Sequence, residues 1–479
     1  MPYLPDPRVL SVVQHPSEST RQALWDEVDP AVFPRRTLRF RNQRAAATVG
    51  LDSLSPADWE RHFARFEPLP QNLPRPLALR YHGHQFRHYN PQLGDGRGFL
   101  YGQLRDGQGR LLDLGTKGSG TTPWSRGGDG RLTLKGGVRE VLATEMLEAL
   151  GVNTSKTFSL FETGEALYRG DEPSPTRSSV LVRLSHSHVR IGTFQRLAAV
   201  GDLDGMRAMV AYASTELFRG LDGSPGAFLR AVVAGTARTT AAWMAAGFCH
   251  AVLNTDNINV TGESFDYGPW RFLPTLDPNF TAAYFDHSGL YAYGRQPQAV
   301  FWNLQQLALA LSPLDSDLQP ALADFGTLYF EALRGQFLRR LGLASAGEAA
   351  DTVLVHALVD WLATTQIGFD QAFFDLYGGA AGEARRARSP AREAYSCGSG
   401  GPFTDLAAVL DAFSPAHPER LASAYFDREQ PVSMVIGQVE AVWDAIDLKD
   451  DWGPLQKLVG EIRVLGEVLG DDGSGLGGG

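Results

Sequence analysis

The sequence predicts an α+β protein in which a small β-rich lobe precedes a larger helical lobe. Between residues 77 and 134, short apolar runs alternate with glycine-rich segments, which is typical of strands joined by tight turns. From about residue 193 onward, apolar residues recur with helical spacing, most clearly over 226–246 and 299–311. The length of 479 residues allows two or three domains of ordinary size.

The clearest strand pair lies in the middle of the β-rich lobe. Residues 99–105 and 110–117 are strand-like segments separated by the turn Asp106-Gly-Gln-Gly109, so we expect a hairpin. Alternation along the second strand places Lys117 on the face opposite Leu112 and Leu114.

A helix is expected directly after this hairpin, over residues 138–150. Its apolar residues form a helical stripe, and Gly151 is the expected terminator. Glu140 lies on a different face of the helix. Further strands are expected around 157–161 and 180–184.

The composition disfavours several classes of protein. The chain has 44 Lys and Arg against 54 Asp and Glu, a net charge of −10, which disfavours general binding to nucleic acid or to anionic membranes. Its two cysteines, Cys249 and Cys397, are too far apart for a zinc module or a disulfide scaffold. We see no membrane span, signal peptide or transit peptide, and therefore expect a cytoplasmic protein with neither nucleic acid nor membrane as partner.

A glycine-rich segment precedes the hairpin and could cradle a phosphate. In Leu93-Gly-Asp-Gly-Arg-Gly98, the glycines Gly94 and Gly96 leave backbone N–H groups free to face an anion. An ordinary tight turn is the alternative.

The order of elements around this segment is that of a protein-kinase small lobe. A glycine-rich loop is followed by a strand ending in Lys117 and a helix carrying Glu140, and a Lys held by a Glu presents a fixed ammonium to phosphate oxygens. Taken singly, each residue is more often a solvated surface charge, and only their order favours a site.

A metal site is predicted further along the chain. Asn257, followed by Asp266 in an Asp-aromatic-Gly triplet, supplies oxygen ligands of the kind that hold Mg²⁺ against nucleotide phosphates. Counting back along the kinase pattern H-R-D-x-x-x-x-N places Val252 where the catalytic Asp should stand. Asp256 is then the nearest carboxylate that can accept a hydroxyl proton.

Two arginines add a second set of phosphate-binding candidates. Arg183 and Arg190 are seven residues apart, and a bend over 185–188 would let both converge although a straight strand would not. Guanidinium groups suit terminal phosphates, but surface pairing is an equal alternative. His186 and His188 are interpreted as polar loop residues because no third metal ligand is near in sequence.

At these residues the sequence resembles the selenoprotein O or YdiU family of protein adenylyltransferases. The matching strings occur in family order over about residues 70–315. They are Gly83-His-Gln-Phe86, Pro91-Gln-Leu-Gly-Asp-Gly-Arg97, Gly115-Thr-Lys-Gly-Ser-Gly120, Gly128-Asp-Gly-Arg131, Val138-Arg-Glu140, Ser187-His-Val-Arg-Ile-Gly192, Leu253-Asn-Thr-Asp-Asn257, Phe265-Asp-Tyr-Gly-Pro269, Tyr291-Ala-Tyr-Gly-Arg-Gln-Pro297 and Trp302-Asn-Leu304.

The resemblance implies a bilobal, protein-kinase-like (pseudokinase) fold with extra segments at both ends. It implies that ATP binds inverted relative to kinases, so that AMP passes to Ser, Thr or Tyr hydroxyls of protein substrates, and we expect a monomer. Asp256 would be the catalytic carboxylate, Glu140 would orient Lys117, and Asn257 and Asp266 would hold Mg²⁺, with Mn²⁺ as the alternative. The residues that would contact ATP are Gly94, Gly96, Arg97, Lys117, Asp129, Gly130, Arg183, Arg190 and Asp266.

The chain departs from the family pattern in three places. The region after about residue 380 matches the family poorly. Nothing after Cys397 is a cysteine, whereas family members typically carry Cys or selenocysteine close to the C-terminus. Arg87 stands where the family usually has glycine. We therefore expect altered regulation with the catalytic set intact.

Two other functions remain open from the sequence. One is a phosphotransferase, which Val252 argues against; the other is a catalytically inactive nucleotide-binding scaffold, which Lys117, Asn257 and Asp266 argue against. The expected regions are an N-terminal extension (1–70), a nucleotide-binding N-lobe (71–195), a helical C-lobe (196–380) and a C-terminal helical extension (381–479). Residues 378–402 have the composition of a linker, and 470–479 that of a flexible tail.

Overall fold

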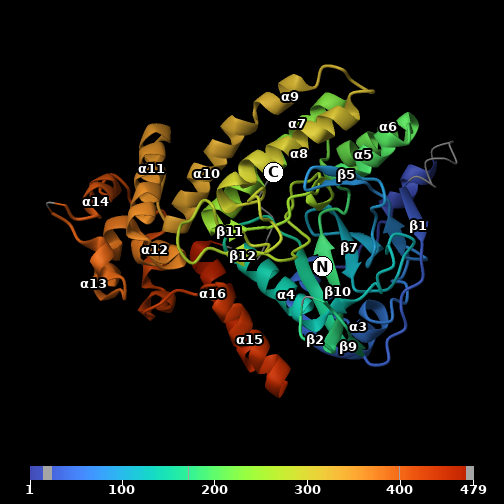
Figure 1. Cartoon of the computed structure of the whole chain (residues 1–479), viewed down its shortest axis with the longest axis horizontal. Coiled ribbons are helices and arrows are strands. Elements are labelled where there is room, and N and C mark those ends of the chain that lie inside the picture. Colours follow the sequence, from blue (N-terminus) through green and yellow to red (C-terminus); the bar gives the residue numbers. More distant parts are fainter. Residues whose placement is uncertain (15–23, 171, 399, 471–479) are drawn as a thin grey trace.

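The computed structural model describes residues 1–14, 24–170, 172–398 and 400–470. It is a mixed α/β structure with an antiparallel sheet toward one side and helices covering the rest (Figure 1). The main sheet has the order β1 (Trp25–Glu27), β3 (Leu77–Leu79), β6 (Leu100–Arg105), β7 (Leu111–Lys117), β10 (Thr176–Ser185), β9 (Lys156–Leu167) and β2 (Thr37–Arg41), and β8 (Leu132–Thr133) pairs with β10. The strand that ends in Lys117 is therefore central, with a neighbour on each side.

The two faces of the sheet are buried by different helices. On one face, α4 (Leu134–Ala149) packs against β9 and β10, and begins at Thr133, whose hydroxyl accepts the N–H of Gly136 as an N-cap. On the other face, Trp59 of α3 (Pro56–Phe63) stacks on Phe158 with ring centroids 5.0 Å apart. Burial on both faces holds the central strands rigidly.

The remaining helices follow the sheet in sequence. They are α2 (Gln43–Thr48) near the start, then α5 (Ile191–Ala199), α6 (Leu203–Tyr212), α7 (Pro225–Ala246), α8 (Gln296–Leu311), α9 (Gln319–Ala323), α10 (Phe325–Leu341), α11 (Glu348–Thr365), α12 (Phe369–Leu376), α13 (Glu383–Arg388), α14 (Thr404–Leu410), α15 (Ile436–Lys449) and α16 (Gly453–Leu469). Two small hairpin-like pairs, β4 (Gly83–Gln85) with β5 (His88–Asn90) and β11 (Phe248–Cys249) with β12 (Arg271–Phe272), lie outside the main sheet. No described helix is both long and apolar enough to cross a membrane.

Several predicted elements are confirmed. The hairpin is formed by β6 and β7 around Asp106–Gly109, with Arg105 opposite Leu111. The predicted helix over 138–150 is α4, which begins four residues earlier than expected at Leu134. The segments predicted as strands around 157–161 and 180–184 are the longer β9 and β10.

The predicted linker over 378–402 is wrong. This stretch contains α13, and the carboxylate of Asp375 accepts hydrogen bonds from Ser389 at 2.6 Å and from Tyr395 at 2.9 Å. The small residues that indicated a linker instead allow a tightly folded segment that carries buried polar contacts. The predicted tail lies outside the described residues from position 471 on.

Both terminal regions are part of the main body. From the N-terminal region, β1 and β2 form the two edges of the sheet. From the C-terminal region, α16 packs on α4, where Arg463 pairs with Glu145 at 2.8 Å. Lys135 of α4 pairs with Glu440 of α15 at 2.6 Å. The helix that carries Glu140 is thus held between the sheet and the C-terminal helices.

Candidate active site

A buried Lys–Glu pair lies where the central strand faces α4. Lys117, the last residue of β7, forms an ion pair with Glu140, and the two are 4 % and 1 % exposed. The ammonium also lies 3.0 Å from the carboxylate of Asp266. Lys117 therefore links the sheet, the helix and the loop that follows Phe265.

The carboxylate of Asp266 is surrounded by cations. Arg183 and Arg190 lie 3.8 Å and 3.9 Å from it, in addition to Lys117. Burial alone would raise its pKa, but Lys117, the two arginines and Arg97 together hold the pKa well below its usual value. Asp266 is therefore ionised at neutral pH, as a metal ligand must be.

Arg183 presents an unused part of its guanidinium group to this cluster. Its Nε and Nη1 atoms are buried and have no hydrogen-bond acceptor within the described ranges. The group lies over the ring of Phe265 at 5.3 Å and is 4 % exposed. A buried cation with free donors is a costly arrangement that an incoming anion would relieve.

Arg190 is more firmly built into the fold. It donates to the backbone oxygen of Asp256 at 2.8 Å, pairs with Asp95 at 3.2 Å and stacks on Tyr81 at 4.4 Å. Arg190 therefore positions the turn that carries Asp256 as well as contributing positive charge near Asp266.

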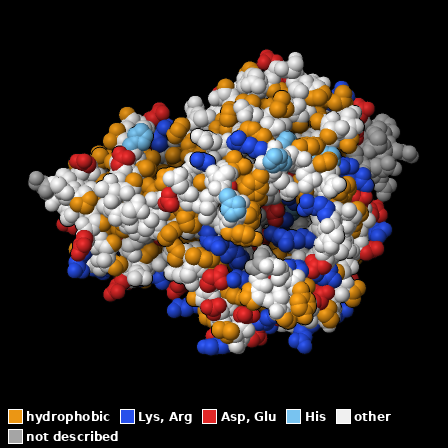
Figure 2. All heavy atoms as spheres, viewed as in Figure 1, with side chains coloured by type: hydrophobic (Ala, Val, Ile, Leu, Met, Phe, Trp, Pro, Cys, Tyr) orange, Lys and Arg blue, Asp and Glu red, His pale blue; other side chains and the backbone are white. Residues whose placement is uncertain are grey.

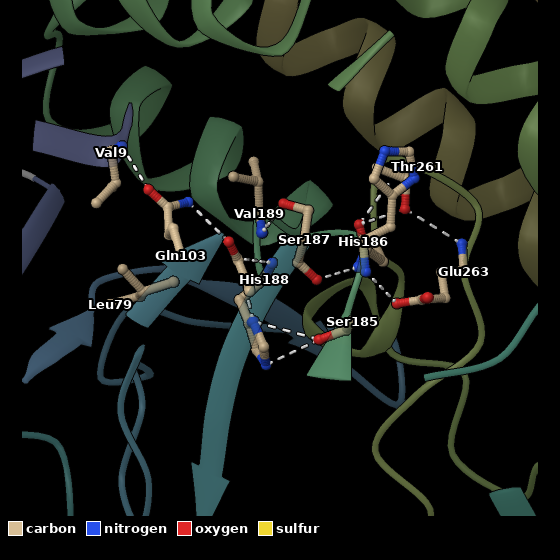
Figure 3. Close-up of polar contacts among 12 residues, drawn as sticks. Val9, Leu79, Gln103, Ser185, His186, Ser187, His188, Val189, Thr261 and Glu263 are labelled. Carbon is tan, nitrogen blue, oxygen red and sulfur yellow. Dashed lines mark hydrogen bonds and ion pairs between the residues drawn. The ribbon is translucent and has the colours of Figure 1, made fainter. Parts of the chain in front are cut away.

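The bend between the two arginines has its own support (Figure 3). Asp113 of β7 accepts the backbone N–H of His188 at 2.9 Å and the side-chain amide of Gln103 at 2.7 Å. Glu263 accepts the backbone N–H of His186 at 2.9 Å. These carboxylates fix the chain after Ser185, so that Arg183 and Arg190 converge on one point as the bend predicts.

Asp256 lies in a short 3-10 turn, Thr255–Asn257, next to this cluster. Its carboxylate is 7 % exposed, and burial raises its pKa to about 6 although Arg190 opposes the shift. The Oδ1 atom has no hydrogen-bond partner in the described part of the chain. A Cβ atom on Gly83 would stand 2.7 Å from it, so the close approach of β4 requires glycine.

Asn257 follows Asp256 with its amide already oriented. The side-chain nitrogen donates to the backbone oxygen of Val252 at 3.0 Å, which leaves the amide oxygen as the free acceptor. Among the described residues no three His, Cys, Asp or Glu side chains form a closed metal cage. One amide oxygen and the ionised Asp266 fit Mg²⁺, which takes its other ligands from phosphate and water.

The glycine-rich segment lies against the loop after β7. A Cβ atom would be 2.4 Å from the Trp124 ring at Gly94 and 2.8 Å from the Trp124 backbone oxygen at Gly96. Both glycines therefore allow a close approach of this loop, whatever ligand the segment holds. Arg97 is exposed, and its backbone oxygen accepts the N–H of Gly118 at 2.7 Å.

Asp129 and Gly130 lie in the same loop but at its outer side. Asp129 is exposed and pairs with Arg169 at 2.8 Å. Gly130 has φ +68° and its backbone approaches Gly120 so closely that a side chain would collide. The structure therefore joins Asp129 to Arg169 at the outer side of the loop.

Three residues of the site were not predicted from the sequence. Tyr81 and Phe265 provide the rings that flank the arginines, and Asp95 is the buried partner of Arg190. Asp95 stands between Gly94 and Gly96, so the glycine-rich segment was the available signal for it. Phe265 directly precedes Asp266 in the string Phe265-Asp-Tyr-Gly-Pro269, which was the available signal for it, whereas Tyr81 joins the site only through contacts across the fold.

In the space-filling view, this face has a hollow where Lys or Arg side chains surround an acidic one (Figure 2). In the same view it lies between the labels of β10 and α8 in Figure 1. A positively charged recess with an acidic floor suits a metal-bound polyphosphate.

Comparison with known proteins gives one consistent result. The family model described as "Protein adenylyltransferase SelO" matches residues 10–463. A protein of Gloeobacter violaceus named "Protein nucleotidyltransferase YdiU" is 47% identical, over 92% of this chain and 92% of its own. A protein of the same name from Synechococcus elongatus is 44% identical, and the match covers 93% of this chain and 94% of that protein. A third, from a Bradyrhizobium species, is 34% identical, and the match covers 93% of each chain.

Proposed function

The chain belongs to the SelO family of protein adenylyltransferases, and on this premise we propose that it transfers AMP from ATP to Ser, Thr or Tyr hydroxyls of proteins. The family expected from the motifs is thereby confirmed. The poor match expected after about residue 380 is wrong, because the family model extends to residue 463. The observation that carries the proposal is the buried guanidinium of Arg183, whose free donors face the Lys117–Asp266 cluster. If the terminal phosphates of ATP bind Arg183, they lie deep in the site and the α-phosphate lies toward Asp256.

The proposed fold is kinase-like, with lobes at 71–195 and 196–380. The Lys117–Glu140 pair between a central strand and a helix is the feature that supports it. Val252 occupies the place of the kinase base and carries no proton acceptor. This supports a reaction other than γ-phosphate transfer.

In the proposed reaction the acceptor hydroxyl attacks the α-phosphorus of ATP. A new phosphorus–oxygen bond forms, and the bond between the α-phosphorus and the α–β bridging oxygen breaks. Pyrophosphate leaves, and the cations around Arg183 balance its negative charge. Asp256 accepts the hydroxyl proton on its carboxylate. Asn257 and Asp266 would hold Mg²⁺ or Mn²⁺, which neutralises charge on the phosphates when bound.

Two labelled forms of ATP test the proposal. The protein is incubated with Mg²⁺ and ATP labelled at the α or at the γ position, together with a mixture of acceptor proteins. Stable α-label on protein supports AMP transfer. Transfer of γ-label would instead show a phosphotransferase, and ATP binding without either label an inactive scaffold.

The rate should depend on pH through Asp256. Because burial raises the pKa of this carboxyl to about 6, it is protonated below that pH and ionised above it. A general base must be ionised, so the rate should fall about tenfold per pH unit below pH 6 and level off above. A pH–rate profile at saturating ATP measures this, and the residual rate of Asp256→Asn should lack the acidic limb. A profile that is flat between pH 5 and 7 in both proteins would contradict the role of base.

Replacement of Arg183 tests whether ATP binds inverted or in the orientation found in kinases. In Arg183→Met, ATP should bind about ten- to a hundredfold more weakly, because a charge-assisted bond contributes roughly 1.5–3 kcal/mol. AMP lacks the terminal phosphates and should bind as before. Calorimetry with both nucleotides measures the difference, and equal losses for ATP and AMP would remove the support for inversion. The unliganded variant loses the 3.8 Å pair with Asp266, which keeps Lys117 and Arg190 as partners, so it should still fold.

A further inference from the structure

A row of aromatic side chains borders the turn that carries Asp256. The ring centroids of Tyr284 and Phe285 are 5.1 Å apart, those of Phe285 and Phe86 5.9 Å, and those of Phe86 and Tyr291 5.0 Å. We call these four residues the aromatic ledge. Tyr284 is 77 % exposed and Phe285 42 %, so the outer half of the ledge faces solvent. Adjacent exposed aromatic rings are typical of surfaces that bind another molecule.

The ledge is tied to the catalytic turn by hydrogen bonds. The backbone N–H of Phe86 and the hydroxyl of Tyr291 both donate to Oδ1 of Asn254, at 3.0 Å and 2.8 Å. The backbone N–H of His84 donates to Oγ1 of Thr255 at 2.7 Å. Asn254 and Thr255 immediately precede Asp256, so Phe86 and Tyr291, the inner members of the ledge, are fixed relative to the proposed base.

The turn that presents Phe86 is strained. Phe86 and Arg87 form the two-residue connection between β4 and β5, in which Gln85 pairs with His88, and their φ angles are +48° and +66°. Such a connection favours Asn-Gly, because bulky residues are rarely found at positive φ. Strained backbone persists where the surrounding structure holds it and where it serves a site. Here the strained turn places the side chain of Phe86 in the ledge and that of Arg87 next to it.

Arg87, the residue after Phe86, supplies an exposed cation next to the ledge. Its guanidinium lies over the ring of Trp302 at 5.4 Å, and it forms no ion pair with any carboxylate of the described ranges. The nearby Asp286 is buried and accepts the backbone N–H groups of Leu290 and Tyr291 at 2.9 Å and 2.8 Å, so its charge is already used. A stacked, unpaired guanidinium is suited to a carboxylate from outside.

We propose that the aromatic ledge and Arg87 form the docking surface for the acceptor protein. The surface takes an acceptor segment that places a large apolar side chain on Phe285 and a carboxylate on Arg87, with the hydroxyl directed toward Asp256. This inference rests on the proposed function, since it names the acceptor class of that reaction: hydroxyl residues flanked by an acidic and an aromatic residue.

Peptide binding tests the surface without requiring catalysis. The probe is a short fluorescein-labelled peptide in which serine and tyrosine are flanked by glutamate and phenylalanine. The control peptide has lysine in place of glutamate and glycine in place of phenylalanine. Fluorescence polarisation should show at least fivefold tighter binding of the acidic peptide, as expected for an exposed ion pair and ring contact. Arg87→Glu should reverse the preference and Phe285→Ala should reduce it. Arg392→Glu, an exposed arginine in the segment beside α13, is the matched control and should change nothing.

Arg87→Gly supplies a second, independent readout. Glycine adopts φ +66° without strain, and Arg87→Gly and Arg87→Ala both lose the contact with Trp302. Arg87→Gly should therefore melt at a higher temperature than Arg87→Ala, while both lose the preference for the acidic peptide. A lower melting temperature than that of Arg87→Ala would show that the turn is not strained as proposed. Equal binding of the two peptides to the wild type, or no effect of Arg87→Glu, would overturn the docking surface.

AMP transfer then distinguishes this inference from the proposed function. Where peptides are modified, Arg87→Glu and Phe285→Ala should raise the KM for the acidic peptide and leave the KM for ATP unchanged. If peptide binding follows the ledge but no peptide or protein takes up AMP, the docking surface stands and the proposed reaction is wrong. If sedimentation shows a dimer that Phe285→Ala dissociates, the ledge is a contact between copies of this chain and the proposal is overturned.

Discussion

Asp266→Ala should reduce AMP transfer by about a thousandfold or more, which corresponds to roughly 4 kcal/mol of transition-state stabilisation. The carboxylate is ionised because Lys117, Arg183 and Arg190 surround it, and it is the strongest candidate to hold the metal against the phosphates. Steady-state rates with Mg²⁺ at saturating ATP measure the loss. Asp266→Asn should lose as much, since an amide keeps the shape but not the charge.

The fold should survive the loss of Asp266. Lys117 keeps Glu140 and Arg190 keeps Asp95, while Arg183 loses its 3.8 Å pair with Asp266 and keeps its contact with the ring of Phe265. Asp204→Ala, which removes an exposed carboxylate of α6, is the control and should keep full activity. If Asp266→Ala turned over nearly normally with Mg²⁺, the metal assignment would be wrong.

The sequence predicts best the parts of the structure that local rules determine. The hairpin of β6 and β7 follows from a glycine-rich turn between two strand-like runs, and α4 follows from its apolar stripe and its glycine terminator. Lys117 and Glu140 are found because their order along the chain matches that of a known kind of site.

What the sequence does not predict depends on contacts between distant segments. Residues 378–402 look like a linker by composition, but Arg385 is buried there and donates to the backbone oxygen of Phe374, 11 residues earlier. Asp95 and Tyr81 join the site only because Arg190 reaches them from the far side of the bend. No spacing rule relates such residues, since their separation in sequence is set by the whole topology.

A double replacement separates the structural from the catalytic role of the Lys117–Glu140 pair. Lys117→Met alone leaves Glu140 buried without its ammonium partner, and breaking a buried pair costs about 3–5 kcal/mol of unfolding free energy. Adding Glu140→Met replaces the ion pair by two apolar side chains of similar length. Asp266, which also loses Lys117, keeps Arg183 and Arg190, so stability should recover most of the loss. Urea unfolding of the single and double variants measures both changes.

Activity should not return with stability. In the double variant no ammonium remains at the end of β7 to meet phosphate oxygens, so AMP transfer should stay as low as in Lys117→Met while the protein is fully folded at the assay temperature. A lysine that merely supports the fold would behave differently, because its activity would recover together with the unfolding free energy. Recovery of transfer in Lys117→Met/Glu140→Met would therefore assign the pair to the core of the protein and leave phosphate binding to Arg183 and Arg190.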